Sequence, residues 1–274
     1  MDWANRVAIV SGASSGIGQA TARRLLSEGA RVALVARRLE PLESVASIAP
    51  DRSLVLLADV SQRDAVRRLV DQVLDRWQRV DVLVHSAGLL TLGPLELSED
   101  RAVEILGANL LGAIWFAQSV LPPMRQNAFG RIVFVGSVDS YVAPAGYSLY
   151  AASKWGLRAL AQSLRAELHA SGIYVSLVSP YYVQTAMLDA ERQHGPLPGF
   201  RQRDVLAAET IADAILRAAD DKQKELVLAP WSIKLGLWLG QLLPGLQDVV
   251  LAREGRHLLR AMTSQGPDPS ATAR

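Results

Sequence analysis

Ser11-Gly-Ala-Ser-Ser-Gly-Ile-Gly18 is the stretch that decides the fold of this chain. It follows the apolar run Arg6–Ser11 and leads into a helical pattern that begins near Ile17, so its glycines occupy a strand-to-helix turn. Gly12, Gly16 and Gly18 have no side chains, which lets backbone N–H groups at the helix N-terminus approach a pyrophosphate. A tight turn without a ligand fits the same glycines, so this motif alone does not identify a function.

Short apolar runs alternate with helical patterns along the rest of the chain. One such pattern places Val66, Leu69, Val70, Val73, Leu74 and Trp77 at helical spacing, and Ser61 with Asp64 predicts a capping box at its start. The alternation predicts an α/β fold with a single doubly wound parallel sheet of the Rossmann type and helices on both faces. The predicted strands are Arg6–Ser11, Arg31–Ala36, Ser53–Ala58, Val80–His85, Arg131–Val135, Tyr174–Ser179 and Glu225–Ala229.

Composition excludes several classes of function. The 274 residues are 50% hydrophobic, which is enough to bury the core of one large α/β domain. Lys and Arg number 29 against 27 acids and are scattered along the chain, so we expect no nucleic-acid partner. The absence of cysteine and the wide spacing of the four histidines predict no metal site and fit a reducing cytoplasm. The N-terminal residues lack the layout of a secretory signal, so we expect no export.

A second motif, Tyr150-Ala-Ala-Ser-Lys154, carries chemistry. On a helix, residues four apart share a face, so the Lys154 ammonium can lie beside the Tyr150 phenol. At about 4 Å and an effective dielectric near 20, their attraction is roughly 4 kcal/mol, on the order of three pKa units. The motif therefore predicts a lowered pKa for Tyr150 and a tyrosine that can exchange protons near neutral pH.

The end of the second predicted strand indicates which dinucleotide the chain prefers. An acid at this place binds the adenosine ribose hydroxyl in many dinucleotide sites, but here Ala36 is followed by Arg37 and Arg38. Two cations favour a 2′-phosphate, so we predict NADP(H) over NAD(H), although a solvated basic turn fits the same residues. Asp59, after the third strand, is expected to accept a hydrogen bond from the adenine amino group.

Taken in order, these motifs resemble those of the short-chain dehydrogenase/reductase family, from Arg6 to about Ala229. The glycine turn is similar to the family's TGxxxGxG with Ser11 for threonine, and Asp59-Val60 resembles its adenine-contacting pair. We expect a single NADP-binding catalytic domain over residues 1–264, which includes a C-terminal helical extension from about residue 231. The glycine, prolines and small polar residues of 265–274 predict a disordered tail. The resemblance implies four catalytic residues, which are Asn109, Ser137, Tyr150 and Lys154.

By this resemblance, the chain is an oxidoreductase that transfers a hydride between NADP(H) and a carbonyl compound or secondary alcohol. Tyr150 would donate a proton to the carbonyl oxygen while Ser137 hydrogen-bonds the same oxygen. Lys154 would hold the nicotinamide ribose, and Asn109 would order a water between Lys154 and solvent. The implied cofactor-binding residues are Gly12, Ser14, Ser15, Gly16, Ile17, Gly18, Arg37, Arg38, Asp59, Val60, Ser86, Ala87, Gly88, Tyr150, Lys154, Pro180, Val183 and Thr185.

Three segments depart from the family's pattern. His85-Ser86-Ala87-Gly88 replaces the usual Asn-Asn-Ala-Gly, and we expect His85 to be structural. Tyr181 replaces a glycine, so that Tyr181 and the following Tyr182 either shape the substrate wall or pack against a neighbouring helix. Ser15 stands where many NADP-preferring relatives carry a basic residue, which leaves phosphate recognition to the two arginines.

The chain continues beyond the resemblance with an apolar extension, residues 231–251. Its interspersed polar residues argue against a membrane span, and a helix would carry one apolar face. That face could cap an apolar substrate pocket, dock on a second subunit, or rest in a membrane interface. We expect it to form a wide entrance for a bulky hydrophobic ketone, aldehyde, steroid-, retinoid- or lipid-like substrate. The face consists of Trp231, Leu235, Trp238, Leu239, Leu242 and Leu246.

One alternative from another class of protein stays open at this point. A non-catalytic NADP(H)-binding sensor or interaction protein could keep the fold and lose turnover, and the departures at His85, Ser86 and Tyr181 leave room for this. The resemblance further implies a homodimer or homotetramer formed by the helices around 109–126 and 150–171. We expect a cytoplasmic protein, with the apolar extension as the only candidate for peripheral membrane contact.

Overall fold

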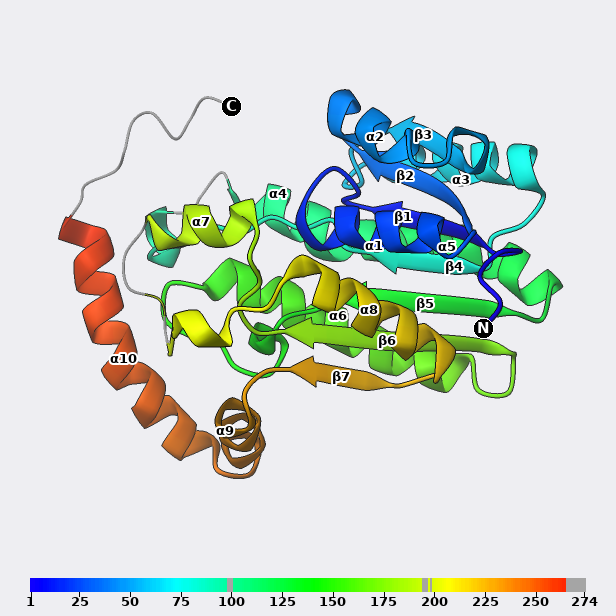
Figure 1. Ribbon diagram of the computed structural model, residues 1–274. Coiled ribbons are helices and arrows are strands. Elements are labelled where there is room, and N and C mark those ends of the chain that lie inside the picture. Colours follow the sequence, from blue (N-terminus) through cyan, green and yellow to red (C-terminus); the bar gives the residue numbers. More distant parts are fainter. Residues whose placement is uncertain (98–100, 194–196, 198, 265–274) are drawn as a thin grey trace.

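One parallel sheet forms the centre of the molecule. The computed structural model describes residues 1–97, 101–193, 197 and 199–264, and the expected tail at 265–274 lies outside them. Within the described residues, the strands form one seven-stranded sheet in the order β3-β2-β1-β4-β5-β6-β7, so the predicted fold class is confirmed (Figure 1). The strands are β1 Val7–Ser11, β2 Arg31–Ala36, β3 Ser53–Leu57, β4 Val82–His85, β5 Gly130–Val135, β6 Ile173–Pro180 and β7 Glu225–Leu228.

Helices cover both faces of this sheet. Successive strand residues point to opposite faces, so Val7 and Ile9 of β1 join one core while Ala8 and Val10 join the other. The first core packs against α3 (Arg63–Trp77), α5 (Gly112–Gln126) and α6 (Ser148–Glu167). The second packs against α1 (Gly16–Ser27), α2 (Leu39–Ala46) and α8 (Ala208–Asp220). Burial on both faces explains why the strands are continuous apolar runs in the sequence.

The start of α3 differs from the prediction. The helix begins at Arg63, and its N-cap, Gln62, makes no side-chain cap hydrogen bond. Ser61 lies before the helix, where its backbone N–H donates to Asp59 Oδ1 at 2.9 Å. The predicted capping box of Ser61 and Asp64 is therefore wrong, because the turn after β3 places Ser61 outside the helix. The predicted helical face is correct, since Val66, Leu69, Val70, Val73 and Trp77 are all buried.

The sheet changes direction of growth between β1 and β4, which are neighbours although two strands separate them in the chain. In an open parallel sheet, the loops that leave the carboxyl ends of the strands on the two sides of such a point diverge and leave a crevice. The loops after β1 and β4 carry the glycine turn and Ser86–Gly88. The topology therefore opens a site beside the glycine turn.

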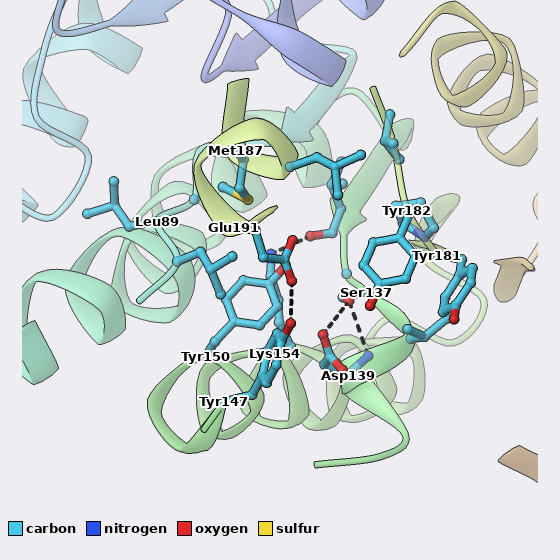
Figure 2. Close-up of a pocket in the computed structure, with 18 of the residues that line it drawn as sticks. Leu89, Ser137, Asp139, Tyr147, Tyr150, Lys154, Tyr181, Tyr182, Met187 and Glu191 are labelled. Atoms are coloured by element: carbon cyan, nitrogen blue, oxygen red, sulfur yellow. Dashed lines mark hydrogen bonds between the residues drawn. The ribbon is translucent and has the colours of Figure 1, made fainter. Parts of the chain in front are cut away.

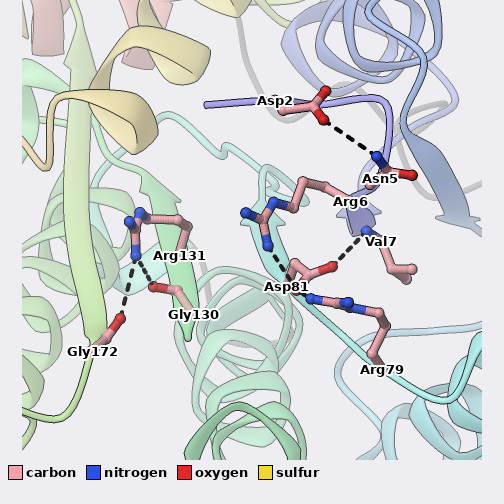
Figure 3. Close-up of polar contacts among 9 residues, drawn as sticks. All are labelled: Asp2, Asn5, Arg6, Val7, Arg79, Asp81, Gly130, Arg131 and Gly172. Carbon is pink, nitrogen blue, oxygen red and sulfur yellow. Dashed lines mark hydrogen bonds and ion pairs between the residues drawn. The ribbon is translucent and has the colours of Figure 1, made fainter. Parts of the chain in front are cut away.

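At the other end of the sheet, where the strands begin, charged side chains form hydrogen bonds and ion pairs (Figure 3). Asp81, which is fully buried ahead of β4, accepts a hydrogen bond from Val7 N at 2.9 Å and pairs with Arg79 at 2.5 Å and Arg6 at 3.6 Å. Arg131 donates to the carbonyls of Gly130 and Gly172 at 2.8 and 3.3 Å. These contacts satisfy charged groups that would be costly to bury alone.

The apolar extension forms two helices instead of one. Helix α9 spans Trp231–Leu242, and α10 spans Pro244–Ser264, which crosses the carboxyl-terminal edge of the sheet (Figure 1). Pro244 is the first residue of α10, a position where its missing N–H costs nothing. The face predicted from the sequence is exposed, with Trp231 at 77% and Trp238 at 59%, whereas Leu237 and Gly240 are buried. This face is therefore not part of the core of the chain.

A second apolar stretch of helix, Arg101–Gln126, is long and apolar enough to cross a membrane by length and composition, with a mean hydropathy of 1.4 in its most apolar window. It joins α4 (Arg101–Leu106), the π-helical turn η3 (Gly107–Leu111) and α5. Phe116, Val120 and Met124 of α5 lie in the core of the sheet, as expected for the core helix of an α/β fold.

Candidate active site

A cavity of about 1100 Å³ opens at the carboxyl ends of the strands. It has room for a dinucleotide and a substrate side by side, since single ligand pockets commonly measure about 300–1,000 Å³. The structure brings into it all the predicted site residues except Gly18 and Asn109. Those that line the cavity are Gly12, Ser14, Ser15, Gly16, Ile17, Arg37, Arg38, Asp59, Val60, Ser86, Ala87, Gly88, Ser137, Tyr150, Lys154, Pro180, Val183 and Thr185.

The three glycines of the turn have different tasks. Gly12 has φ +71°, and a Cβ there would lie 2.8 Å from the backbone N of Ala87, so only glycine fits. Gly16 has φ +54° and faces the Thr185 methyl group. Gly18 does not line the cavity, and a Cβ there would meet the Gly12 carbonyl oxygen at 2.3 Å. Its role is to let α1 pack closely on the turn, not to contact a ligand.

The loop after β4 is held by a hydroxyl that the sequence analysis did not single out. Ser11 Oγ accepts hydrogen bonds from the backbone N–H groups of Ser86 and Ala87, both at 3.2 Å. His85 Nδ1 lies 3.0 Å from Ser11 Oγ, and His85 Nε2 lies 3.2 Å from the Ala108 carbonyl oxygen. Burial lowers the pKa of His85 to about 3, so the ring is neutral. His85 is thus structural, as expected, and it orients the hydroxyl that anchors the loop.

The adenosine end of the cavity is basic. Arg37 and Arg38 are both exposed at its rim. Arg38 Nη2 donates to Ser14 Oγ at 3.3 Å, which brings its guanidinium next to the glycine turn. Asp59 lines the same end, with Oδ1 engaged by the Ser61 N–H. The two arginines thus lie where the sequence predicted a phosphate-binding group.

Tyr150 and Lys154 lie one helical turn apart on α6 and face the cavity (Figure 2). Lys154 Nζ is 5.5 Å from the centroid of the Tyr150 ring and donates a hydrogen bond to the Val135 carbonyl oxygen at 2.9 Å. Both side chains are at least nine-tenths buried. The predicted neighbourhood of cation and phenol is therefore present, and β5 fixes the position of the ammonium.

The protonation of this pair differs from the prediction. The pKa of Tyr150 is raised, first by burial, which disfavours the phenolate, and then by the carboxylate of Asp139. The neighbouring side chain of Ser137 acts in the opposite direction and lowers the pKa of Tyr150. The prediction of a lowered Tyr150 pKa is wrong because burial and the charge of Asp139 disfavour the phenolate. Burial also lowers the pKa of Lys154 to about 8.

Ser137 begins a short helical turn, η4 (Val138–Ser140), and its hydroxyl is held by Asp139. Ser137 Oγ donates to Asp139 Oδ2 at 3.1 Å and accepts from the Asp139 N–H at 3.1 Å (Figure 2). Burial raises the pKa of Asp139 to about 7, while the hydrogen bond from Ser137 and the charge of Lys154 oppose the shift and Glu191 adds to it. Asp139 also lines the cavity, so it belongs to the same cluster of ionisable groups as Tyr150 and Lys154.

Asn109 lies beneath the cavity, on the π-helical turn η3. Its side chain accepts from Leu89 N at 2.7 Å and donates to Leu89 O and Ser153 Oγ, both at 2.9 Å. Both amide hydrogens are therefore used within the protein. A Cβ on Gly88 would lie 3.3 Å from Asn109 Oδ1 and 3.7 Å from Lys154 Nζ, which places the asparagine close to the lysine. Its side chain fixes the loop after β4 against α6.

Two further polar groups of the cavity were missed in the sequence. Glu191, on α7 (Ala186–Arg192), is buried and accepts a hydrogen bond from the Tyr147 hydroxyl at 2.5 Å. Burial raises the pKa of both groups. Only the apolar residues around Glu191, Leu188 among them, hinted at its burial, because a lone acid in a helical pattern normally faces solvent.

The two tyrosines after β6 serve both of the purposes considered for them. Tyr181 and Tyr182 line the cavity, with ring centroids 4.4 Å apart. Tyr181 also packs in a cluster with Val138 and with Leu237 of α9. Both tyrosines therefore shape the cavity wall, and Tyr181 also packs against the neighbouring helix α9.

One cavity on this doubly wound sheet thus contains a glycine-rich turn and the buried side chains of Ser137, Tyr150 and Lys154. A family model described as short chain dehydrogenase matches residues 6–195. The chain belongs to the short-chain dehydrogenase family. Members of this family are oxidoreductases that bind NAD(P), and the chain is therefore an oxidoreductase of this kind.

Three relatives illustrate the range of this short-chain dehydrogenase's neighbours. The chain is 30% identical to a dehydrogenase/reductase SDR family protein 7-like of Anopheles gambiae, covering 92% of this chain and 84% of that protein. It is 32% identical to the 3-oxoacyl-[acyl-carrier-protein] reductase MabA of Mycobacterium avium, with 87% and 92% covered. A metagenomic short-chain oxidoreductase solved in complex with NADP is 31% identical, with a TM-score of 0.69 and 81% and 96% covered.

Replacing His85 with asparagine, the residue usual in the family, should make this short-chain dehydrogenase less sensitive to acid. Between the unfolded pKa of 6.5 and the folded value of about 3, the unfolded chain binds a proton that the folded chain does not. The free energy of unfolding therefore falls as the pH falls, by up to about 1.4 kcal/mol per pH unit from this group. Urea unfolding at several pH values should show a shallower decline for His85→Asn, whereas the exposed His169→Asn should match the wild type. Equal slopes for all three proteins would contradict the buried neutral ring.

Proposed function

We propose that this chain is an NADP(H)-dependent oxidoreductase that transfers a hydride between NADP(H) and a carbonyl compound or secondary alcohol. The observation that carries the proposal is the convergence of Ser137, Tyr150 and Lys154 on the cavity that also receives the glycine turn. The two ends of this cavity suit the two reactants, because one offers backbone N–H groups and cations while the other offers buried proton donors. A non-catalytic sensor would have no need for a buried, polarised tyrosine.

The chain's own residues would position the reactants and move the proton. When bound, the cofactor supplies or accepts the hydride at the substrate carbon. Tyr150 would donate its phenolic proton to the substrate oxygen, and its raised pKa keeps that proton in place at neutral pH. Lys154, held by the Val135 carbonyl, would stabilise the phenolate that remains. Because the phenol is protonated, the site is better suited to carbonyl reduction than to alcohol oxidation.

Three features favour NADP(H) over NAD(H). No acid follows β2, and Arg37 and Arg38 line the adenosine end of the cavity. The contact from Arg38 to Ser14 ties that guanidinium to the turn that would cradle the pyrophosphate. A relative 31% identical to this chain was solved with NADP bound. A 2′-phosphate would meet both cations at the rim, where each charged hydrogen bond is worth about 1.5–3 kcal/mol.

The substrate we propose is bulky and hydrophobic. The cavity wall opposite the glycine turn is built by the C-terminal helices, which contribute Ile233, Leu237, Leu243, Leu246 and Val250. These side chains would bury apolar substrate surface at about 25 cal/mol per Å². A small polar substrate would leave this wall in contact with water, so a large ketone, aldehyde or lipid-like carbonyl compound fits best.

The outer face of the same helices is an apolar surface that we propose is covered when the protein functions. Trp231, Leu235, Trp238 and Leu242 are exposed, which is more apolar surface than a monomer normally leaves in water. A second copy of the chain in a homodimer or homotetramer, or a membrane reached from the cytoplasm, would cover it. Sedimentation of the protein alone and co-flotation with phospholipid vesicles distinguish the two.

Tyr150→Phe should abolish carbonyl reduction and leave cofactor binding intact. Phenylalanine keeps the ring but has no proton to donate, so kcat should fall roughly 100- to 10,000-fold. A panel of carbonyl compounds followed at the NADPH absorbance band supplies the assay, and quenching of protein fluorescence measures NADPH binding. Tyr174→Phe, at the partly exposed far end of β6, is the matched control. Equal turnover in Tyr150→Phe would refute the assignment, and inactivity of the wild type on every compound would favour the sensor.

Arg37→Asp should shift the preference from NADPH towards NADH. The change removes a cation from the 2′-phosphate and supplies an acid for a ribose hydroxyl. We expect kcat/KM with NADPH to fall roughly 10- to 100-fold, the equivalent of losing one charged hydrogen bond. Arg31→Asp makes the same charge change at the opposite, exposed end of β2 and should change neither kcat/KM with NADPH nor the preference between NADPH and NADH. An unchanged NADPH-to-NADH ratio in Arg37→Asp would rule out the proposed phosphate contact.

Leu237→Ala should weaken the use of bulky apolar carbonyl compounds. Leu237 is 8% exposed and lines the cavity, so truncation removes about 2–5 kcal/mol of packing, part of which contacts substrate. KM for the largest active compound should rise at least several-fold, while a small aldehyde should be affected little. Leu242→Ala removes the same atoms from the exposed outer face of α9 and serves as control. If the two variants behave alike, α9 does not form a substrate wall.

A further inference from the structure

The hydroxyl of Ser137 is committed to Asp139 in this structure. It donates its hydrogen to Asp139 Oδ2 and accepts from the Asp139 backbone N–H, each at 3.1 Å. Asp139 is 8% exposed and lines the cavity, and its other carboxyl oxygen has no hydrogen-bond partner among the described residues. A serine hydroxyl has one hydrogen and two lone pairs. While Asp139 is a carboxylate, that single hydrogen is therefore unavailable to a substrate oxygen.

Protonation of Asp139 removes this conflict. A neutral carboxylic acid carries its own O–H, which can donate to Ser137 Oγ across the same short separation. The serine hydrogen is then released and can turn towards the substrate oxygen beside Tyr150. The backbone N–H of Asp139 continues to hold Ser137 Oγ in place, so only the direction of one hydrogen bond changes.

The surroundings of Asp139 favour the neutral acid more than those of an ordinary aspartate. Burial and the carboxyl of Glu191, on α7, disfavour the carboxylate, while the hydrogen bond from Ser137 and the charge of Lys154, on α6, favour it. Tyr150 and Tyr147, on or next to α6, and Tyr182, after β6, all interact electrostatically with Asp139 as well. The result is a pKa of about 7, so that both forms of Asp139 are populated at neutral pH.

The charge of Asp139 also acts directly on Tyr150. Its carboxylate is the second-largest cause of the raised Tyr150 pKa, after burial. Proton donation by Tyr150 leaves a phenolate, which a neighbouring anion destabilises and a neutral acid does not. Neutral Asp139 thus helps twice, by freeing the Ser137 hydrogen and by easing the departure of the Tyr150 proton.

We propose that Asp139 is a positioning residue which, as a neutral carboxylic acid, donates to Ser137 Oγ and so directs the Ser137 hydroxyl hydrogen to the substrate oxygen. The proposal rests on the proposed function, because it assigns Ser137 a substrate oxygen to bind. It adds a residue that acts through Ser137 and makes the help that Ser137 gives depend on pH. That help is present below the pKa of Asp139 and is lost as the pH rises through it.

The kinetic test separates the contribution of the Ser137 hydroxyl to kcat/KM from the titrations of other groups. The ratio of kcat/KM for wild type to that for Ser137→Ala measures the contribution of the hydroxyl, and titrations that Ser137 does not affect, such as that of Lys154, are common to both proteins. We expect this ratio to fall roughly tenfold per pH unit above about pH 7. In an Asp139→Asn background the same ratio should be constant with pH. A ratio that is independent of pH in the first pair, or that varies equally in both, would overturn the proposal.

A second measurement does not depend on turnover. Below about pH 7, infrared spectra of the protein should contain the carbonyl band of a buried carboxylic acid. The band should vanish in Asp139→Asn and shift in Ser137→Ala, because its hydrogen-bond acceptor is then gone. Asp189→Asn, which changes an exposed carboxylate on α7, should leave both the band and the kinetic ratio unchanged. Absence of the band refutes the proposal even in an active enzyme, and inactivity of the wild type with the band present refutes only the proposed function.

Discussion

The burial of ionisable side chains around one cavity governs the chemistry of this protein. Asp139, Tyr150, Lys154 and Glu191 all lie in it with at most 9% of their surfaces exposed. Burial is the largest cause of the pKa shift of each of them, and in every case it favours the neutral form. Interactions among these groups then decide how far each shift goes. The protonation of each group therefore depends on the charges of its neighbours.

The cavity exists because two loops on either side of the β1–β4 boundary approach each other closely. Gly12 allows backbone contact with Ala87, and Ser11 Oγ holds the amides of Ser86 and Ala87. His85 completes the arrangement from within β4, and its low pKa ensures that the ring stays neutral and keeps a lone pair. Ser11 and His85 thus hold the loop after β4 from within the chain, although His85 and Ser86 replace the family's asparagine pair.

The part of the site built on regular elements could be predicted from the sequence, and the part built by packing could not. Gly12, Gly16, Tyr150 and Lys154 carry their geometry locally, because a turn or a helix fixes the relation of neighbours in the chain. The pKa of Tyr150 could not be predicted, since the groups that set it approach from another loop and from α7. Glu191 was invisible for the same reason.

The strands and the C-terminal extension show the same division between what the sequence predicts and what packing decides. All seven strands were predicted within two residues, because each is an apolar run buried on both faces. The C-terminal extension was correctly predicted to be helical, but its break at Pro244 and the exposure of its tryptophans depend on what it packs against. Periodicity identifies an apolar face and says nothing of which face a tertiary partner covers.

Two buried aspartates at opposite edges of the sheet show how surroundings separate structure from chemistry. Asp81, at the amino-terminal edge, is surrounded by the guanidinium groups of Arg79 and Arg6 and by the Val7 amide. Asp139, at the carboxyl-terminal edge, accepts a hydrogen bond from the Ser137 hydroxyl, and its backbone N–H donates to Ser137 Oγ. Glu191 raises the pKa of its carboxyl group and Lys154 lowers it. Asp81, with two guanidinium groups and a backbone amide around it, has a structural role where the strands begin. A carboxyl group without such pairing can exchange a proton at neutral pH, and the sheet places that group where its loops leave a cavity for a substrate.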